Sequence, residues 1–185
     1  VETLMSQGYV YIGMDHFALP QDELVRAQES GDLHRNFMGY TTRKQTDLIG
    51  FGVSAISQVA DCYAQNAKDI QTWSARIDAG KPATVRGLCT DPDDRIRAEV
   101  IQAIMCRGAL RFSDIETRFD IDFDGYFGHE LDDLAELADD GLLALDAEGL
   151  QVLPAGRLLL RAIAARFDAY LPGRPRAAAP LLKAQ

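Results

Sequence analysis

The feature that most constrains the fold is a change of pattern after Thr90. Asp91-Pro92-Asp93-Asp94 is a strong helix start, because proline suits the first turn and acidic side chains suit the positive end of the helix dipole. Apolar residues at helical spacing then predict a helix over residues 93–107. Ser113, with Glu116 three residues later, predicts the N-cap of a second, shorter helix.

The pattern continues with a third helix, predicted over residues 124–140, and a hairpin around the turn Asp146-Ala147-Glu148-Gly149. A fourth helix follows Pro154, and its predicted buried face is Leu159, Ile163, Phe167 and Tyr170. Three helices followed by a β-ribbon is the order of a winged-helix module. We therefore assign residues 91–171 to a mainly α, winged-helix-like domain.

The charge of this module argues against DNA binding, although winged helices often place the helix before the wing in the major groove. From Asp120 to Glu148 there are eleven acidic residues and no Lys or Arg. Phosphates would repel each of these carboxylates, so we predict a structural or protein-contact role and no nucleic-acid partner. The acidic run at residues 130–140 is interpreted as the solvated face of the third helix.

The first 90 residues have a mixed pattern. Residues 8–13 predict a short strand, and Asp22 and Glu23 open a helix that stops near Ser30-Gly31. Residues 32–46 show no strong period, residues 55–59 read as strand, and residues 68–79 predict a helix. We interpret residues 1–90 as the end of an α/β domain that begins upstream, and residues 172–185 as a disordered tail.

The composition excludes several classes of protein. A length of 185 residues, 47% hydrophobic and 25% charged, with a formal net charge of -9, is typical of an ordinary globular protein. No apolar run approaches the roughly 20 residues of a membrane span, and nothing at the N-terminus resembles a signal peptide. We expect a cytoplasmic protein without a membrane partner, and the start at Val1 suggests part of a longer protein.

The three cysteines, Cys62, Cys89 and Cys106, lie 27 and 17 positions apart. None of the short spacings of zinc or iron–sulfur sites is present. We predict three reduced, mostly buried thiols and no cysteine-ligated metal in this chain.

Two further patterns are candidate functional sites. Gly50-Phe51-Gly52-Val53-Ser54-Ala55 matches the dinucleotide fingerprint G-x-G-x-x-A, but strand rather than helix is predicted after it, so that interpretation is disfavoured. The glycines either let the backbone approach a ligand closely or form a bulge or tight packing contact. His16 is predicted to be a hydrogen-bonded structural histidine, whose neighbour Asp15 points away from it on an extended chain.

Several long segments resemble one family, the oxygen-independent coproporphyrinogen III oxidases (coproporphyrinogen dehydrogenases), which are radical S-adenosylmethionine (SAM) enzymes. The segments are Tyr11–Ala18, Leu33–Thr42, Asp47–Ser57, Asp61–Asn66 and Ala155–Leu159. They occur in order and nearly without gaps from about residue 4 to residue 171. The resemblance is to the C-terminal part of such an enzyme.

The resemblance implies a fold and a reaction. The implied fold class is α+β: terminal strands and helices of a partial (β/α) barrel, followed by the winged-helix-like domain. Enzymes of this family use a [4Fe–4S] cluster and SAM to generate a radical, which removes hydrogen from two propionate side chains of coproporphyrinogen III. These become vinyl groups with loss of carbon dioxide, yielding protoporphyrinogen IX in haem (porphyrin) biosynthesis.

The resemblance also assigns residues. It implies that Ile56 contributes to SAM binding, which favours the close-approach interpretation of the glycines before it, and that Phe37 and Met38 line the active site. Some relatives carry Gln where this chain has Met38, and Met38 cannot make the same hydrogen bonds. No catalytic residue and no metal ligand is assigned, because the CxxxCxxC cluster motif is absent and the chain alone is expected to be inactive.

Coproporphyrinogen III is therefore the expected substrate of the full-length enzyme, and a monomer is expected. The alternative is a non-enzymatic relative on the same scaffold, acting in haem handling or protein–protein contact.

Overall fold

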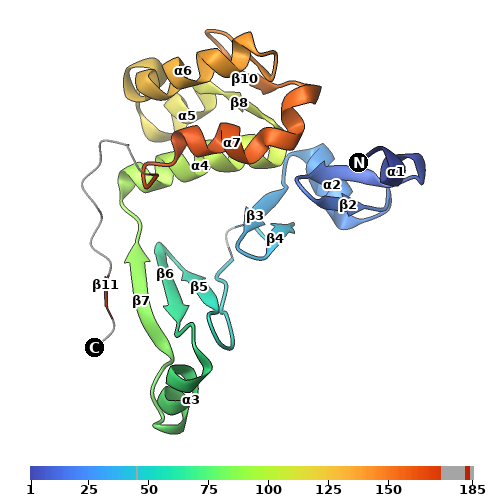
Figure 1. Cartoon of the computed structure of the whole chain (residues 1–185). Coiled ribbons are helices and arrows are strands. Elements are labelled where there is room, and N and C mark those ends of the chain that lie inside the picture. The colour runs from blue at the N-terminus through green and yellow to red at the C-terminus, as the bar shows by residue number, and fades with distance from the viewer. Residues whose placement is uncertain (45, 172–181, 184–185) are drawn as a thin grey trace. The chain divides into compact units, whose positions relative to one another are not determined.

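A computed structural model describes residues 1–44, 46–171 and 182–183 of the chain. They belong to two compact units, Val1–Lys44 with Asp94–Arg174 and Gln45–Asp93 with Pro175–Gln185. Each unit is described by itself. Figure 1 shows the elements and their labels.

The N-terminal segment of the first unit consists of short elements. They are α1 (Glu2–Ser6), β1 (Val10–Gly13), β2 (His16–Ala18), α2 (Glu23–Ser30), β3 (His34–Asn36) and β4 (Gly39–Thr41). Strands β1 and β2 form one antiparallel hairpin, and β3 and β4 form another. Asp22 caps α2 by accepting a hydrogen bond from the Leu24 amide, and Gly31 ends it with φ 80°. The predicted strand and helix of this segment are confirmed.

The remainder of the first unit is the helical module with its small sheet. Its elements are α4 (Pro92–Arg107), β8 (Ala109–Arg111), α5 (Phe112–Phe119), α6 (Phe123–Asp139), β9 (Leu143–Leu145), β10 (Gly149–Val152), the 3-10 turn Pro154–Leu159, α7 (Leu160–Ala164) and a second 3-10 turn, Ala165–Phe167. The sheet is antiparallel with the order β8-β10-β9. The first three predicted helices and the hairpin are present, the predicted fourth helix is the short α7 between two 3-10 turns, and β8 is an additional strand.

The core of this module is built from aromatic and aliphatic side chains. Phe112 stacks on Phe123 with ring centroids 4.1 Å apart, and Phe127 packs against both Phe123 and Phe167. Phe123, Phe127 and Phe167 are fully buried. Burial of so much aromatic area is the main source of stability here.

Two sequence predictions in the module are wrong in detail. Ser113 is not an N-cap, because α5 begins at Phe112 directly after β8, with Arg111 in the capping position and no side-chain cap. Leu159 and Tyr170 are exposed at 44% and 47%, whereas Ile163 and Phe167 are buried as expected. The irregular 3-10 turns shift the helical register, so Leu160 takes the buried position.

The second unit holds β5 (Ile56–Val59), β6 (Cys62–Asn66), α3 (Ile70–Asp78), β7 (Thr84–Cys89) and β11 (Leu182–Lys183). The strands form an antiparallel sheet in the order β11-β7-β6-β5. Asp69 caps α3 by accepting a hydrogen bond from the Thr72 amide at 2.7 Å, and this bond lowers the pKa of the Asp69 carboxyl.

The α+β class is confirmed, and the strand pairs among the described residues are antiparallel. The division into domains at residues 1–90 and 91–171 stays a prediction. The predicted disordered tail, residues 172–185, lies outside the described residues except for the β11 pair. In the part of the chain that the structure describes, no helix is long and apolar enough to cross a membrane.

Candidate functional site

The hairpin of β3 and β4 carries two of the predicted site residues at its tip. Asn36 pairs with Gly39, so Phe37 and Met38 form a two-residue turn. The Asn36 Oδ1 atom accepts a hydrogen bond from the Met38 amide at 2.8 Å, which holds the turn closed. The Phe37 side chain is 54% exposed and that of Met38 is 83% exposed. The hairpin therefore presents an aromatic ring and a thioether to its surroundings.

Helix α4 holds this hairpin through side-chain contacts to its backbone. The Gln102 carboxamide accepts from the Arg35 amide at 3.1 Å and donates to the Arg35 carbonyl at 2.5 Å, as a neighbouring strand would. The Tyr40 hydroxyl donates to the Met105 carbonyl at 2.9 Å. These three hydrogen bonds hold both strands of the hairpin against α4, and so fix the position of the Phe37–Met38 turn relative to that helix.

Packing around Tyr40 restricts the hairpin further. The ring of His16 meets the Tyr40 ring edge-on at 5.2 Å, and the Arg35 guanidinium lies 5.9 Å from the centroid of the same ring. Gly39 has φ +133°, and a Cβ there would lie 2.8 Å from Nε2 of His16. Glycine is required at this position for both reasons.

His16 differs from its prediction in two respects, because its buried Nδ1 atom makes no hydrogen bond and Asp15 does not point away from it. Its Nδ1 atom lies 2.8 Å from Asp15 Oδ1, so Asp15 does face the ring, although the two atoms are not aligned as a hydrogen bond. The chain is not extended there, because Met14 has φ 53° and turns the backbone before β2. The neighbouring carboxylate can therefore approach the imidazole.

Burial raises the pKa of two side chains behind the hairpin. The pKa of the Tyr40 hydroxyl rises to about 12 and that of the Cys106 thiol to about 11, in both cases mainly because burial penalises the charged form. Burial also lowers the pKa of His34, and the nearby Lys44 ammonium lowers it further. The Tyr40 hydroxyl and the Cys106 thiol therefore stay neutral near neutral pH.

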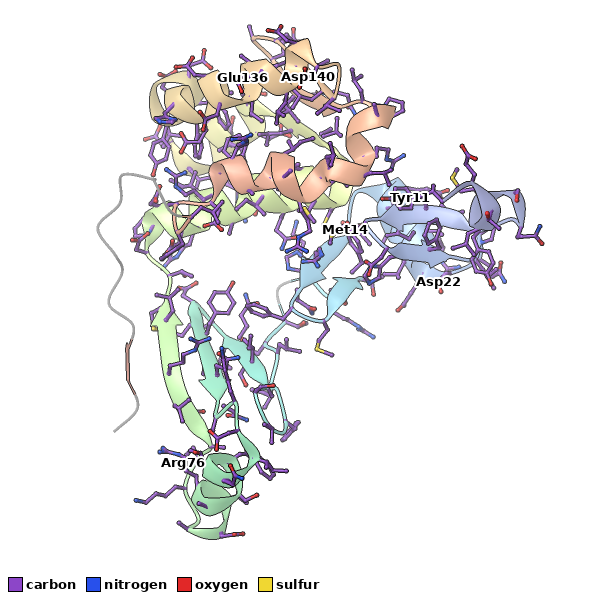
Figure 2. The ribbon with its side chains drawn as sticks, viewed as in Figure 1. Tyr11, Met14, Asp22, Arg76, Glu136 and Asp140 are labelled. Atoms are coloured by element: carbon purple, nitrogen blue, oxygen red, sulfur yellow. A yellow bond between two sulfur atoms is a disulfide. The ribbon has the colours of Figure 1, made fainter. Side chains whose placement is uncertain are left out.

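The first hairpin, β1 and β2, has an aromatic ring at its base. The Tyr11 hydroxyl donates to the Met14 carbonyl at 3.0 Å, and both residues are labelled in Figure 2. The Arg157 guanidinium lies 5.5 Å from the Tyr11 ring centroid. Arg157 comes from the Ala155–Leu159 segment, so two segments of the family resemblance meet here.

Ile56 lies in the second unit, at the start of β5. It pairs with Gln65 of β6, and its side chain is half-buried. The loop before it is tied down by side chains of β5 and β6: the Gly50 amide donates to Ser57 Oγ at 3.0 Å, and Asn66 Nδ2 donates to the Gly52 carbonyl at 2.9 Å. An aliphatic side chain on a braced strand end suits contact with a flat apolar ring.

The two glycines of this loop have different roles. A Cβ at Gly50 would lie 2.6 Å from the Ile56 carbonyl oxygen, so Gly50 packs against the chain's own backbone, which is the tight-packing alternative. Gly52 has φ +99° and open space beside it. Phe51 between them is 90% exposed. No helix follows the glycines, as predicted, because β5 begins at Ile56.

The prediction of three reduced thiols is wrong. Cys62 and Cys89 form a disulfide, because they are direct partners in the antiparallel register of β6 and β7 with Cα atoms 4.1 Å apart. Cys106 is free and buried, as predicted. The 27-residue separation of the first two gives no hint of this register, which only the β6–β7 pairing reveals.

The chain does not fit an iron–sulfur cluster. Among the described residues, no group of three or more His, Cys, Asp or Glu side chains is arranged to hold a metal ion. Two of the three cysteines are joined to each other, and the third is buried alone. The three cysteines of this chain therefore do not supply the set of thiolates that an iron–sulfur cluster needs.

The acidic run of α6 is largely solvated, as interpreted from the sequence. Asp132, Glu136, Asp139 and Asp140 are exposed, and Figure 2 labels Glu136 and Asp140 on this helix. Glu130 is the exception: it is buried and pairs with Arg97 Nη1 at 2.8 Å. Its carboxylate therefore stabilises the contact between α4 and α6.

Comparison with known proteins gives these elements a context. Residues 90–159 match the family model described as the HemN C-terminal domain. The oxygen-independent coproporphyrinogen III oxidase of Pseudomonas aeruginosa is 53% identical over 175 residues, covering 95% of this chain and 38% of the relative. That of Thermostichus vulcanus is 51% identical over 173 residues, covering 92% of this chain and 53% of the relative.

A solved structure agrees. The coproporphyrinogen III oxidase (HemN) from Escherichia coli, a radical SAM enzyme, superposes with a TM-score of 0.87 at 49% identity, over 92% of this chain and 39% of that one. This chain matches the C-terminal part of the oxygen-independent coproporphyrinogen III oxidases. The family resemblance recognised in the sequence is confirmed, and the chain corresponds to the C-terminal part.

The chain spans about 38% of the length of the Pseudomonas aeruginosa relative. The resemblance predicts Phe37, Met38 and Ile56 as site residues; the first two share a turn, whereas Ile56 belongs to the other compact unit. The sequence analysis did not single out Arg35 and Tyr40, which are paired across β3 and β4. Predicting a hairpin with a two-residue turn at Phe37 and Met38 would have placed them opposite each other.

Proposed function

We propose that this chain forms the C-terminal part of an oxygen-independent coproporphyrinogen III dehydrogenase of haem biosynthesis. The full-length enzyme would carry out the oxidative decarboxylation of coproporphyrinogen III to protoporphyrinogen IX. The observation that carries the proposal is the match over 92% of the chain, at 49% identity and a TM-score of 0.87, to a radical SAM coproporphyrinogen III oxidase. We further propose that the enzyme is cytoplasmic and monomeric.

Within that enzyme, residues 1–90 would form the end of the barrel and its extension, adding antiparallel hairpins to it. Residues 91–171 would form the winged-helix-like cap over the active-site opening. The [4Fe–4S] cluster would be held by thiolates outside this chain. SAM, when bound, supplies the radical that removes hydrogen from the propionate side chains of the substrate.

The residues of this chain would bind and orient rather than react. The exposed ring of Phe37 and the side chain of Met38 would line the active site against the apolar macrocycle of coproporphyrinogen III. Ile56 would contact SAM through its half-buried aliphatic side chain. None of these groups can donate or accept a proton, which is consistent with a positioning role.

The proposal is tested with the full-length protein. It is reconstituted anaerobically with iron and sulfide, and then incubated with SAM, a reductant and coproporphyrinogen III. We expect protoporphyrinogen IX, measured as protoporphyrin IX after oxidation. Absence of this product despite an intact cluster and SAM cleavage would contradict the enzyme proposal, and haem binding without turnover would favour the non-enzymatic relative.

Ile56 gives a separate prediction. Ile56→Asp would place a carboxylate without a partner in the half-buried position, and so should weaken SAM binding by at least tenfold, measured by equilibrium dialysis of the full-length protein. Val59→Asp is the matched control on the same strand, because Val59 is 42% exposed. Equal SAM affinity in the two variants would remove Ile56 from the SAM site.

A further inference from the structure

Arg35 is a half-buried cation without an anionic partner. The chain has 28 acidic residues against 19 basic ones, yet within the described residues no carboxylate pairs with Arg35. Its Nε atom is buried and has no hydrogen-bond partner. A guanidinium has five N–H donors and no acceptor, so one without a carboxylate partner on a hairpin strand is suited to bind an anion.

The position of Arg35 is determined by its neighbours. Both its amide and its carbonyl are bonded to the Gln102 side chain of α4, so its backbone is held from a second element. Its guanidinium lies over the Tyr40 ring, 5.9 Å from the centroid. A guanidinium beside an aromatic ring keeps its N–H groups as hydrogen-bond donors, because the attraction to the ring uses the positive charge. Such pre-organisation lowers the entropic cost of binding a ligand.

The surroundings of Arg35 combine positive charge with apolar surface. Between Leu33 and Thr46 there are three basic residues and no acidic one, in a chain whose net charge is -9. Lys44 lies near enough to lower the pKa of both His34 and Cys106. Two residues after Arg35, the turn exposes Phe37 and Met38. The hairpin therefore presents cations beside an apolar tip.

We propose that the guanidinium of Arg35 binds a propionate carboxylate of the substrate, with Lys44 adding positive charge beside it. The substrate class is a carboxylated tetrapyrrole, whose apolar macrocycle would lie against Phe37 and Met38 while one carboxylate reaches the N–H edge of Arg35. A planar guanidinium group can bind a carboxylate through two parallel hydrogen bonds. This inference rests on the proposed function, and it adds a specificity-determining residue to it.

The test measures binding instead of turnover. Coproporphyrin III, the fluorescent oxidised form with the same propionates, is titrated into the full-length protein, and its affinity is read from fluorescence anisotropy. Arg35→Gln should weaken binding on the order of tenfold, because a charge-assisted pair is lost. Arg35→Lys keeps the charge but loses the planar guanidinium, so its affinity for coproporphyrin III should lie between those of the wild type and Arg35→Gln. Arg161→Gln, which removes one charge from an exposed position on α7, should leave the affinity unchanged.

Lys44→Gln provides a second, independent arm, since Lys44 is exposed and the hairpin contacts do not involve it. It should weaken binding about twofold to threefold, an effect that disappears at high salt. Should Arg35→Gln fail to fold, Arg35→Lys and Lys44→Gln decide, and wild-type affinity in both would contradict the inference. Wild-type binding in Arg35→Gln would overturn the role of Arg35 and leave the proposed function standing. A wild-type protein that does not bind coproporphyrin III would contradict both.

Discussion

At the scale of single residues, the contact between the β3–β4 hairpin and α4 depends on two buried, weakly acidic groups, the Tyr40 hydroxyl and the Cys106 thiol. The Tyr40 hydroxyl donates to the Met105 carbonyl, and the Cys106 thiol donates to Gln102 Oε1 at 3.4 Å. Burial raises the pKa of Tyr40 to about 12 and that of Cys106 to about 11. Both groups stay neutral in the folded state well above neutral pH. The Phe37–Met38 turn is therefore held by contacts that physiological pH does not perturb.

This arrangement predicts a loss of stability at alkaline pH. Because the pKa of Cys106 is higher in the folded state than its ordinary value of 9.0, the unfolded chain loses the proton first. The contribution of the neutral Cys106 thiol to the free energy of unfolding is fully present below pH 9 and is lost as the pH rises to about 11. The loss is roughly 2–3 kcal/mol at most, because each pKa unit corresponds to about 1.4 kcal/mol. Urea denaturation from pH 7 to 11 measures it, with Cys106→Ala as the control. A constant difference between the two proteins over that range would contradict the prediction.

At the residue level, the roles that the resemblance implies for Phe37 and Met38 stay predictions, although the structure places the two residues together at a turn. Prediction from the sequence failed where a contact was non-local. The glycine spacing suggested a ligand next to Gly50, but the neighbour there is the Ile56 carbonyl six residues later. Arg35 has no distinguishing motif, and its importance depends on Gln102, which lies 67 positions away in the chain.

At the scale of elements, three helices that begin with a capping side chain start within two residues of their predicted starts, at Glu23, Ile70 and Phe123. Asp22, Asp69 and Asp122 each accept a hydrogen bond from an amide in the first turn of their helices. The start of α5 was wrong because β8 was not predicted. Its pairing with β10 brings the Phe112 amide to the Glu148 carbonyl, and the helix begins there without a capping side chain. Glu116 instead accepts from the Phe123 amide at 3.0 Å and joins α5 to α6.

The β6–β7 pair depends on its disulfide more than a strand pair in a large core would. Of the fully described buried side chains, only Ala67 and Ala83 belong to the second unit. With so little buried apolar area, the Cys62–Cys89 bond should contribute about 3 kcal/mol by restricting the unfolded chain. Hydrogen exchange of the β6 and β7 amides should accelerate when the disulfide is reduced. Cys89→Ser should show the accelerated rate both with and without reducing agent.

The disulfide itself can be checked by peptide mapping. A tryptic digest of protein alkylated without reduction should contain residues 45–68 joined to residues 87–95, with Cys106 alkylated. Separate, alkylated peptides for Cys62 and Cys89 would show that the thiols are reduced, as the sequence spacing alone suggested.

At the scale of the whole molecule, the order of segments along the chain does not match the compact units. Val1–Lys44 belongs with Asp94–Arg174, whereas Gln45–Asp93 forms the other unit. Sequence periodicity reports on neighbours along the chain, and so it predicted most elements but not this grouping, whereas the α+β class came from the family resemblance. The acidic residues of α6 were predicted as a solvated face, and the buried Arg97–Glu130 pair was not, since a periodic pattern does not reveal an ion pair.

The most direct test of the account exchanges this chain into a known enzyme. The coproporphyrinogen III oxidase of Escherichia coli matches it over 173 residues at 49% identity. A chimera in which this chain replaces the matched region should be assayed anaerobically with SAM and coproporphyrinogen III. We predict that it forms protoporphyrinogen IX, and that Arg35→Gln in the chimera raises the KM for coproporphyrinogen III. A chimera that folds, holds its cluster and cleaves SAM, but forms no protoporphyrinogen IX, would contradict the account.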